Sequence, residues 1–251
     1  MKHAALESRM RDLEYFGETR VLSETWVVVR VDGRGFSRLS EANFEKPFDA
    51  RFHAAMVAVG EALLGEPRGV YAYTESDELS LLLPRGWRMF GGRVEKIVSV
   101  AAGLASAVFS QGCGALAHFD ARLWLGPTDE AVIDYFRWRQ ADALRCSLNG
   151  WCYWTLRKAG WTRRAATGAL EGRSFAEKGA LLAEHGVALG DLPSWQRQGV
   201  AIVSETYEKT GFDPRRQEEV RAVRRRLRVE RALPVGSDYS AFLREVVRRG
   251  A

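Results

Sequence analysis

Two apolar runs in the first third of the chain each lead into acidic residues. Residues 26–31 lead into Asp32, and this run is broken by Gly33 and Gly35. A second run covers residues 69–83 and contains a turn at 75–76, which is followed by Asp77 and Glu78. Runs rich in β-branched and aromatic residues and bounded by turns predict strands. If these strands pair side by side, Asp32 and Asp77 meet at one edge of a sheet.

The spacing of the other apolar residues places helices between the strands. Helical periodicity predicts helices over residues 5–16, 43–64 and 92–110, and a further β-type run predicts a strand over 117–125. The order of strand, helix, hairpin, helix and strand is that of the ferredoxin-like split βαβ unit. We therefore predict an α+β fold. Its core is a polymerase palm-like antiparallel sheet with helices on one face, to which helical and arm-like extensions are added.

Residues 1–125 are predicted to form this palm-like catalytic core, and residues 126–251 a helical and basic part packed on it without a clear linker. Helices are expected over 128–135, 138–158 and 175–185, a basic glycine-rich loop over 163–173, and a strand over 200–204. Asp213 and Pro214 are expected to begin a final basic helix. The many arginines after residue 213 suit a polyanionic partner, although a solvated helix face would also explain them.

The adjacent carboxylates predict a chemistry. Two carboxylates a few ångströms apart repel each other unless a cation lies between them. Mg²⁺ takes one or two carboxylates, keeps waters and accepts substrate phosphates, and a metal pair clamps both oxygens of a phosphoryl displacement. The sharpest interpretation is a two-metal nucleotidyl-transfer site at Asp32 and Asp77. Gly33 lets its carbonyl approach a metal, and the amides of residues 34–37 could form a nest for a triphosphate.

Other polar residues are candidates for phosphate or RNA contacts. Lys46, Arg93 and Lys96 lie near expected helix starts, where phosphate binding is favoured, although each could be an ordinary surface cation. Ser76 could hydrogen-bond a nucleotide or simply stabilise its turn. Cations are interleaved with aromatic residues over 135–158, a pattern that suits RNA. Most of these aromatic residues are expected to be core at helical spacing, and the polar, functional candidates are Arg139, Gln140, Arg145 and Asn149.

Composition narrows the class of protein. The net charge is +5, and residues 7–14 are too charged for a signal peptide. No stretch approaches the roughly 20 uncharged apolar residues of a membrane span. The three cysteines have no metal-ligand spacing, and their odd number argues against a disulfide framework. We therefore expect a reduced, cytoplasmic protein that does not enter a membrane.

The chain resembles a known family through strings that are spread over nearly its whole length: VRVDGRGFSRLS, FEKPFD, YTESDELSLLL, WRQADALRCSLN, CYWTLRK, FAEKGALL and LPSWQRQGV. They are similar to the tRNA(His) guanylyltransferase family, and more closely to its bacterial and archaeal relatives, the Thg1-like 3′–5′ RNA polymerases. The resemblance implies a palm-like domain with helical arms, and often a homotetramer. It also implies that Asp32, the Gly33 carbonyl and Asp77 hold two Mg²⁺ ions, with Glu78 beside them as a catalytic residue.

The resemblance further implies residues that contact substrate. Those expected to bind the nucleotide (ATP, GTP or another NTP) are Asp32, Gly33, Arg34, Gly35, Phe36, Ser37, Lys46, Asp49, Ser76, Asp77, Arg93 and Lys96. Those expected to bind RNA are Arg139, Gln140, Arg145, Asn149, Lys158 and Lys178.

The implied activity is Mg²⁺-dependent 3′–5′ nucleotide addition to the 5′ end of tRNA. ATP activates a 5′-monophosphate, or a 5′-triphosphate is used directly, and the 3′-hydroxyl of an NTP then attacks the 5′ α-phosphate. Cys146 stands where the family usually has Asn, and Gly179 and Ala180 stand where it has Asn and Glu. These departures favour template-dependent repair of 5′-truncated tRNA over guanylylation restricted to tRNA(His).

Two alternatives remain open on the sequence. The first is a palm-fold nucleotide cyclase, although the chain has no GG[DE]EF string. The second is an RNA-binding protein that keeps the fold without catalysis. The intact Asp32, Asp77 and Glu78 argue against this second alternative.

Overall fold

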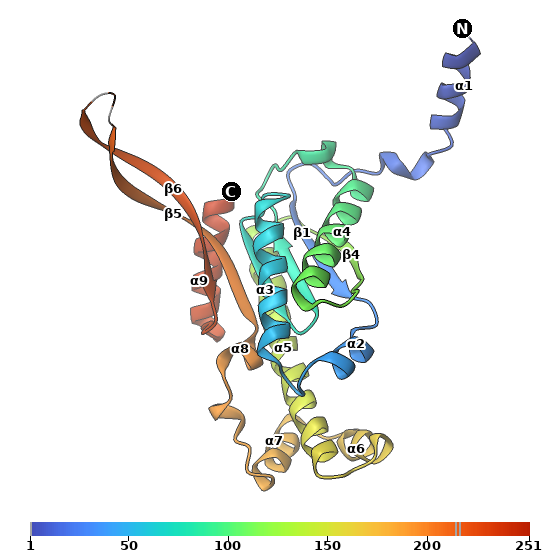
Figure 1. Ribbon diagram of the computed structural model, residues 1–251, viewed down its shortest axis with the longest axis vertical. Helices are drawn as coiled ribbons and strands as arrows, with labels where there is room; N and C mark the ends of the chain where they lie inside the picture. Colours follow the sequence, from blue (N-terminus) through green and yellow to red (C-terminus); the bar gives the residue numbers. More distant parts are fainter. Residues whose placement is uncertain (1, 214, 216) are drawn as a thin grey trace.

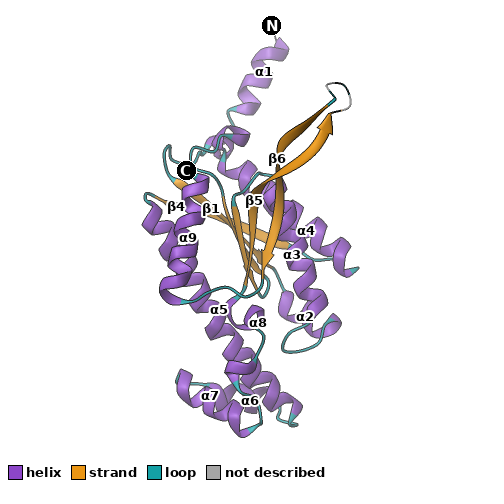
Figure 2. Cartoon of the chain, turned by 90° about the vertical axis from the view of Figure 1, so that its left-hand side faces the viewer, coloured by secondary structure: helices purple, strands orange, loops and turns teal. Residues whose placement is uncertain are grey.

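The computed structural model describes residues 2–213, 215 and 217–251, and it is built around one six-stranded antiparallel sheet (Figures 1 and 2). The strand order is β4-β1-β3-β2-β5-β6. The strands are β1 (Trp26–Gly33), β2 (Tyr71–Glu75), β3 (Glu78–Leu82), β4 (Phe119–Gly126), β5 (Val200–Asp213) and β6 (Glu218–Glu230). The antiparallel sheet and the order of the core elements confirm the predicted fold class.

Strand β1 lies between β3 and β4, and its register fixes which residues meet at the sheet edge. Asp32 is opposite Glu78 in β3 and opposite Asp120 in β4. Successive side chains of a strand point to opposite faces. Val27, Val29 and Val31 accordingly pack into one hydrophobic cluster, and the alternate residues pack into a second cluster on the other face. A strand buried on both faces explains why this run has no polar alternation.

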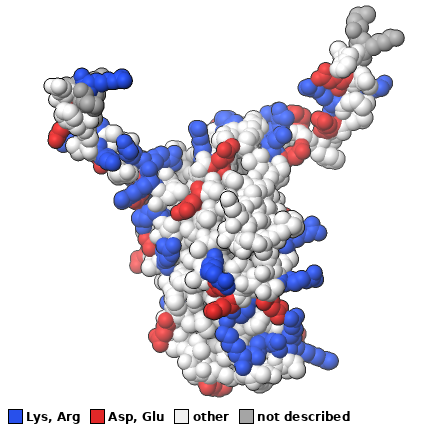
Figure 3. All heavy atoms as spheres, in the orientation of Figure 1, with Lys and Arg blue, Asp and Glu red and all other residues white. Residues whose placement is uncertain are grey.

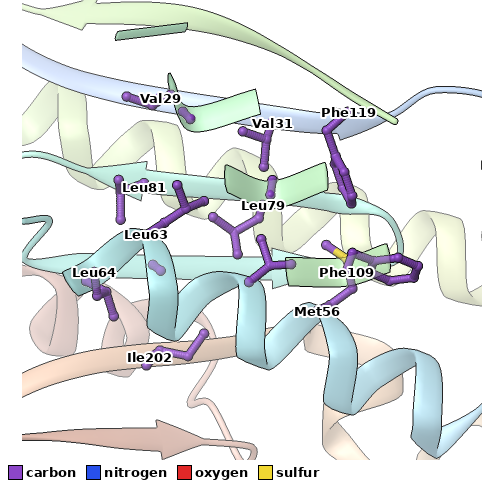
Figure 4. Packing of buried hydrophobic residues seen from close by; sticks show 14 of the residues in the cluster. Val29, Val31, Met56, Leu63, Leu64, Leu79, Leu81, Phe109, Phe119 and Ile202 are labelled. Carbon is purple, nitrogen blue, oxygen red and sulfur yellow. The ribbon is translucent and has the colours of Figure 1, made fainter. Parts of the chain in front are cut away.

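Helices cover both faces of the sheet. On the first face, α3 (Ala50–Gly65) and α4 (Val94–Cys113) contribute Met56, Leu63 and Phe109 to a core with strand residues (Figure 4). On the other face lie α5 (Asp129–Lys158) and α9 (Gly236–Gly250). The two helices of the predicted core therefore lie on one face as expected, and helices of the C-terminal half cover the second face. Each fully buried Leu of this core contributes roughly 1.5–3 kcal/mol.

The helix predicted over 43–64 is two helices, α2 (Phe36–Asn43) and α3. Helix α3 begins only after Asp49, which has extended backbone dihedrals and whose carboxylate accepts a hydrogen bond from the Arg51 amide. An aspartate in this geometry is a strong N-cap, so Pro47 precedes the helix instead of opening it. Helix α1 (Lys2–Arg11) and the 3-10 helix η1 (Tyr15–Glu18) precede β1. A second 3-10 helix, η2 (Met89–Gly92), precedes α4.

Two helical elements of the C-terminal half differ from their prediction. Helix α5 is one continuous helix of 30 residues. The expected basic loop is largely α6 (Arg163–Leu170), which begins at Thr162 because the Thr162 hydroxyl accepts from the Ala165 amide. The expected helix over 175–185 is confirmed as α7 (Phe175–Glu184), with a Ser174–Glu177 capping box. The short η3 (Leu189–Asp191) and α8 (Ser194–Gln198) lead into β5.

The basic helix predicted after Asp213 is wrong, because this segment forms the β5–β6 hairpin, hereafter the arm. Strand β5 begins as a buried edge partner of β2, with Tyr71 opposite Val203, and then leaves the body of the molecule with β6 (Figure 1). Ladder pairing continues out to Asp213 opposite Glu218. Val223, Leu227 and Val229 alternate with polar residues, a period-two pattern typical of strands. Pro214 lies outside the described residues.

The sheet extends across the predicted boundary at residue 125. The C-terminal half supplies β5 and β6 to it, and α5 and α9 cover one of its faces. Among the described residues, α4 is the one helix long and apolar enough to cross a membrane by length and composition. In this fold it packs on α3 and strand β4, with Ala101, Ala105 and Phe109 fully buried.

Candidate active site

The backbone brings the two predicted carboxylates together at one sheet edge. Asp32 lies at the end of β1, and Asp77 lies in the turn between β2 and β3. The Gly33 amide donates a hydrogen bond to the Asp77 carbonyl at 3.0 Å. A Cβ atom at Gly33 would lie 2.9 Å from the Asp77 Cβ and 2.4 Å from the Phe36 ring. Glycine is therefore required here for close approach, and this contact places Asp77 beside Asp32 as predicted.

The electrostatics of the pair are those of two like charges that need a counter-ion. The pKa of Asp77 is raised, mainly because the carboxyl is buried and further because of the negative charge of Asp32. The Ser76 hydroxyl and the Lys46 ammonium act in the opposite direction. Asp32 is half-exposed, and its Oδ2 lies 3.7 Å from Nη2 of Arg122. A cation at this edge would stabilise both carboxylates in their charged form.

The residues at this edge fit a magnesium site that the substrate completes. Within the described part of the chain, no three side chains of His, Cys, Asp or Glu are grouped as metal ligands. Two carboxylates and an unshielded glycine backbone are available instead. Mg²⁺ is commonly bound through one or two carboxylates plus water and substrate phosphates and not by an all-protein cage. The donor set therefore suits Mg²⁺ bound together with a phosphate ligand.

The start of α2 forms the next wall of the site. Gly35 is its N-cap, with a left-handed φ of 75° that favours glycine. Arg34 and Ser37 are exposed beside it. The Phe36 ring is buried against Phe109 and Phe119 at centroid distances of 5.0 and 4.8 Å, so only its backbone is available to a ligand. Helix N-terminal amides have no intrahelical partner and attract anions.

Lys46 and Asp49 lie on the adjoining wall, but they are engaged differently. The Lys46 ammonium donates to the Ser40 hydroxyl at 2.5 Å, and partial burial lowers its pKa. It can still turn toward a phosphate. The Asp49 carboxylate accepts from the Arg51 guanidinium at 2.7 Å, which holds its pKa well below the usual range, and from the amides of Arg51 and Glu45. The Asp49 carboxylate thus caps α3, and the predicted contact of Asp49 with the nucleotide stays a prediction.

A cavity of about 470 Å³ opens from this edge into the protein. Part of its lining consists of charged and hydroxyl groups, among them Ser37, Lys46 and Asp77. Arg163 of α6 pairs with Glu41 of α2 at 2.6 Å, and both residues line the cavity. It is also lined by aromatic rings of α5, α8 and the loop before α3: Phe48, Tyr153, Trp154 and Trp195. This volume and mixed lining are typical of small-molecule sites.

Arg93 and Lys96 do not reach this cavity within one chain. Both lie at the start of α4, where the Val94 amide bonds to the Thr19 carbonyl. The other end of α4 contacts the start of β4, because the Ser106 hydroxyl accepts from the Phe119 amide, and Phe119 is opposite Gly33. A helix of 20 residues is about 30 Å long. Within one copy, Arg93 and Lys96 therefore do not line this cavity, and their predicted contact with a nucleotide stays a prediction.

Arg139 and Gln140 are buried under the site and not on an RNA-binding face. The Arg139 guanidinium contacts Glu75 at 2.9 Å and Glu78 at 2.7 Å, and its side chain is 5% exposed. The Gln140 amide donates to the Pro234 carbonyl at 2.9 Å. The predicted RNA contacts of both residues are wrong, because α5 turns these positions toward the sheet.

Glu78 belongs to the same buried ion cluster. Its carboxylate contacts Arg139 and lies 3.7 Å from Nε of Arg30. Burial raises the pKa of Glu78, and the two guanidinium groups oppose this effect. Glu75 and Glu78 flank the turn that carries Asp77, so Arg139 ties down both ends of this turn. These contacts show that Glu78 helps to hold the turn, and its predicted catalytic role stays a prediction.

The other RNA candidates remain predictions, since no contact in the structure tests them. Arg145 and Lys158 are exposed on α5, and Asn149 and Lys178 are half-buried. The space-filling view shows Lys and Arg gathered along the arm and around the lower part of the molecule (Figure 3). The strand register divides the basic residues of the arm between two faces. The helix predicted for this segment would not divide them in this way. One face carries Lys209, Arg224, Arg226 and Arg228, and the other carries Arg221 and Arg225.

Two family models match the chain and together cover most of it. The model described as tRNAHis guanylyltransferase matches residues 7–127, and the model described as Thg1 C terminal domain matches residues 130–235.

Curated relatives and solved structures are similar over long stretches. The Debaryomyces hansenii protein named tRNA(His) guanylyltransferase is 33% identical over 231 residues, or 85% of this chain and 87% of that protein. The Arabidopsis thaliana protein named tRNA(His) guanylyltransferase 2 is 32% identical over 200 residues, or 74% of this chain; the match spans only 37% of that longer protein.

Two solved structures, each described as a bacterial tRNA(His) guanylyltransferase (Thg1)-like protein, are 26% identical to this chain. The complex with GTP has a TM-score of 0.72 and covers 97% of this chain and 99% of its own. The complex with ATP has a TM-score of 0.75 and covers 96% and 98%. The match therefore extends over the core, the helical part and the arm.

Proposed function

The chain belongs to the tRNA(His) guanylyltransferase family of nucleotidyltransferases, and on that premise we propose that it adds nucleotides to the 5′ end of tRNA in the 3′–5′ direction. The observation that carries this proposal is the approach of Asp77 to Asp32 over Gly33 at the mouth of the cavity. The carboxylate pair needs a cation, and the neighbouring α2 terminus and Lys46 suit phosphates.

In the proposed reaction, the 3′-hydroxyl of an NTP attacks the 5′ α-phosphate of the RNA, and the bond to the leaving group breaks: pyrophosphate leaves from a triphosphate end, and AMP leaves from an end activated by ATP. The RNA end carries a triphosphate or has been activated by ATP. Asp32, the Gly33 carbonyl and Asp77 would hold Mg²⁺, of which we propose two ions. When bound, Mg²⁺ neutralises phosphate charge and lowers the pKa of the attacking hydroxyl.

The protein's own groups have three tasks in this scheme. Asp32 and Asp77 provide the negative charge that binds the cations. The amides at the start of α2, with Arg34 and Lys46, bind and orient the triphosphate. Arg139 holds the Glu75–Glu78 turn so that Asp77 keeps its place. Phosphoryl transfer depends mainly on such positioning and electrostatics, so a protein general base is not required.

We propose template-dependent repair of 5′-truncated tRNA as the physiological reaction. Cys146 lines the cavity, and it replaces an amide side chain that could hydrogen-bond a substrate. Gly179 and Ala180 on α7 likewise offer no side-chain hydrogen bond. A site with fewer such contacts is better suited to base-paired addition at varied RNA ends than to selection of one tRNA.

We further propose a cytoplasmic homotetramer. The free thiols of Cys113, Cys146 and Cys152 agree with a reducing compartment. The N-terminal segment, α1 with η1, projects from the body (Figure 1) and carries exposed Leu6, Met10, Tyr15 and Phe16. Contiguous exposed apolar residues of this kind favour an interface between protein chains.

The proposal is tested by incubating the protein with labelled NTPs, Mg²⁺ and a 5′-truncated tRNA. We expect the RNA to be extended at its 5′ end, with template-directed nucleotides. A labelled cyclic product formed without RNA would instead support a nucleotide cyclase. RNA binding in a gel-shift assay without extension would support a non-catalytic RNA-binding protein. If the protein extends tRNA(His) alone, and by a single G, the proposed repair reaction is overturned, but the proposed 3′–5′ nucleotide addition stands.

A further inference from the structure

The two carboxylates of the site differ in what lies next to them. Asp77 lines the cavity, whereas Asp32 does not. Asp32 is half-exposed and lies directly opposite Asp120 of β4. Strand β4 is at one end of the strand order, so no further strand of the described residues covers its outer side. A reaction that joins an NTP to an RNA end needs two approaches to one site, and the exposed surface along β4 offers a second approach beside the cavity.

The charges of β1 and β4 beside Asp32 are arranged unfavourably for stability. Asp32 is opposite Asp120, and the next pair with side chains on the same face is Arg30 opposite Arg122. Like charges directly opposite each other destabilise an antiparallel pair of strands. An arrangement that served stability alone would place opposite charges across the strands. Local choices that oppose stability are expected at functional sites, so these four residues are candidates for a role in function.

Arg122 is the member of this group that is available to a ligand. Arg30 is largely buried, and its Nε lies 3.7 Å from Glu78. The Arg122 side chain is exposed. Within the described residues its guanidinium donates one hydrogen bond, from Nη2 to Asp120 at 3.1 Å, and the same nitrogen lies 3.7 Å from Asp32. Because a guanidinium has five N–H donors, most donors of Arg122 remain free for an anion.

A metal ion at Asp32 changes which anion Arg122 attracts. Asp32 and the guanidinium attract each other in the structure, and a divalent cation on the same carboxylate offsets this attraction. Arg122 then lies beside the metal site with free donors, and a guanidinium suits phosphate because it can donate two parallel hydrogen bonds to its oxygens. The phosphates of the NTP have Lys46 and the start of α2 on the cavity side. A phosphate on the β4 side therefore belongs to the second substrate.

We propose that Arg122 binds the phosphate at the 5′ end of the RNA, on the β4 side of Asp32. Without substrate, Arg122 is a counter-ion of Asp32 and Asp120. When RNA binds, the guanidinium exchanges the Asp32 carboxylate for phosphate oxygens. The exchange keeps the empty site partly neutralised and supplies positive charge beside the phosphate that is attacked. This inference rests on the proposed function, because it assumes an RNA end at Asp32.

The test compares a 5′-truncated tRNA that carries a 5′-triphosphate with the same RNA that carries a 5′-hydroxyl. Binding of each is measured with Mg²⁺ and without NTP, so that no nucleotide is added. The ratio of the two affinities reports contacts with the end phosphates, because all other RNA contacts are shared. We expect the wild type to prefer the triphosphate RNA, and this preference to fall at least about fivefold in Arg122→Gln. The affinity for ATP should not change.

Arg137→Gln is the matched control. Arg137 also has a 53% exposed side chain and pairs with a carboxylate, Asp134 at 3.2 Å, but it lies on α5. Its variant should keep the wild-type preference for the triphosphate RNA. Circular dichroism and thermal melting check the fold of both variants.

A second measurement, made without RNA, separates substrate binding from a purely structural role. Electron paramagnetic resonance titration measures Mn²⁺ binding in the absence of nucleotide. Arg122→Gln should bind Mn²⁺ at least as tightly as the wild type, because a competing positive charge has been removed from Asp32. If Arg122 acted only by positioning Asp32, the variant would bind Mn²⁺ more weakly.

Three results overturn the inference and leave the proposed function intact. The first is an unchanged preference for the triphosphate RNA in Arg122→Gln. The second is weaker Mn²⁺ binding in this variant. The third is a loss of ATP affinity in this variant, which would assign Arg122 to the NTP. A wild type that extends the RNA with NTPs but does not distinguish its two ends also overturns the inference alone, whereas a wild type that does neither overturns the proposed function as well.

Discussion

Contacts of Gly33 fix the position of Asp77. Gly33 allows the β2–β3 turn to approach β1, and the Gly33 amide holds the Asp77 carbonyl. The carboxyl of Asp77 is buried beside Asp32, which costs free energy unless a cation is bound. A residue pair that destabilises the isolated fold is expected at a functional site.

Asp77→Asn should remove nucleotide addition while keeping RNA binding. The amide has nearly the same shape but no charge, so cation affinity falls while the arm is untouched. We expect addition to a 5′-truncated tRNA to decrease at least about a hundredfold, in line with the loss of several kcal/mol of charge stabilisation by metal ions. Single-turnover extension and gel-shift assays measure the two properties. Asp134→Asn, an exposed α5 carboxylate paired with Arg137, is the matched control; equal activity in Asp77→Asn and the wild type would contradict the assignment.

His53 predicts a pH effect on stability. Its pKa is about 4 in the folded protein because of burial, against an ordinary value of 6.5. The folded state therefore binds fewer protons, and the contribution of neutral His53 is complete above pH 6.5 and is lost as the pH falls toward 4. In urea unfolding followed by tryptophan fluorescence, His53→Phe should lose less stability than the wild type over this range. The control is His3→Gln, at an exposed position on α1, which should lose as much stability as the wild type over this range. A His53→Phe variant that also loses as much stability as the wild type would contradict the account.

At the residue scale, the sequence reveals chemistry better than it reveals burial. Asp32 and Asp77 are predictable because each ends or interrupts an apolar run, and strand pairing then has few alternatives. Arg139 and Asp49 look equally functional in the sequence. Their partners, Glu75 and Arg51, become apparent only when the backbone is in place.

Helix α5 is the element that connects the site to the rest of the fold. It covers one face of the sheet with Val132 and Phe136, and it sends Arg139 into the buried carboxylates. The Arg139 guanidinium contacts Glu75, Glu78 and Asp142, whereas Arg30 and Arg145 each approach only one of these carboxylates. Burial raises the pKa of Glu75 to about 8, and Glu78 opposes ionisation further. The stability of the turn that carries Asp77 therefore depends on Arg139 of α5.

Arg139→Gln should destabilise the protein far more than the same change at a neighbouring arginine. Removing the guanidinium takes away the ion-pair partner of buried Glu75 and leaves Glu78 with Arg30 at 3.7 Å, and breaking such a buried cluster costs about 3–5 kcal/mol. Arg145 pairs with Asp142 on the same helix but has a 62% exposed side chain. Arg145→Gln should therefore cost less than about 1 kcal/mol. Denaturant unfolding measures both values, and similar losses in the two variants would contradict the structural role of Arg139.

At the element scale, the strands were easier to predict than the C-terminal segment. Strands β1 to β3 are mostly apolar, because helices cover both of their faces. The outer arm is covered on neither face, so its sequence is mostly polar and its arginines resemble a solvated helix. The division of the first predicted long helix into α2 and α3 depends on the Asp49 cap. This cap is visible in the sequence but competes with Pro47 as a helix start.

The molecule as a whole combines a negatively charged site with a positively charged arm. The arm extends from the edge of the sheet (Figure 3), and Arg224, Arg226 and Arg228 lie on one of its faces. Arg226 and Arg228 share Glu205, which fixes their guanidinium groups near the base of the arm. This charge distribution explains how one chain can bind a polyanion and still concentrate cations at its catalytic edge.

Shortening the arm should weaken RNA binding selectively. Glu205 and Arg226 are opposite each other in the ladder, so an Asn-Gly turn can replace residues 206–225 and leave the β2–β5 pairing intact. We expect RNA affinity to fall at least tenfold and its salt dependence to become shallower, because fewer counterions are released. ATP binding should be unchanged. An unaltered salt slope, measured by gel shift at several ionic strengths, would show that RNA binds elsewhere.

At this largest scale, the sequence predicts the catalytic core and the presence of a basic extension, but not the shared sheet. Strand β5 adds to the edge of β2 through its first residues, such as Ala201 and Ile202. Only the short run 200–204 is visibly strand-like, so the joining of the two halves into one sheet could not be deduced from it.

The central claim is that Asp32 and Asp77 hold divalent cations over the phosphates of a nucleotide. Electron paramagnetic resonance titration with Mn²⁺, used as a probe for Mg²⁺ in the presence of ATP, counts these ions. The account predicts two Mn²⁺ ions per wild-type chain that are bound together with ATP, and loss of this binding in Asp32→Asn/Asp77→Asn. The same two ions in the double variant, bound with the same affinity, would contradict it.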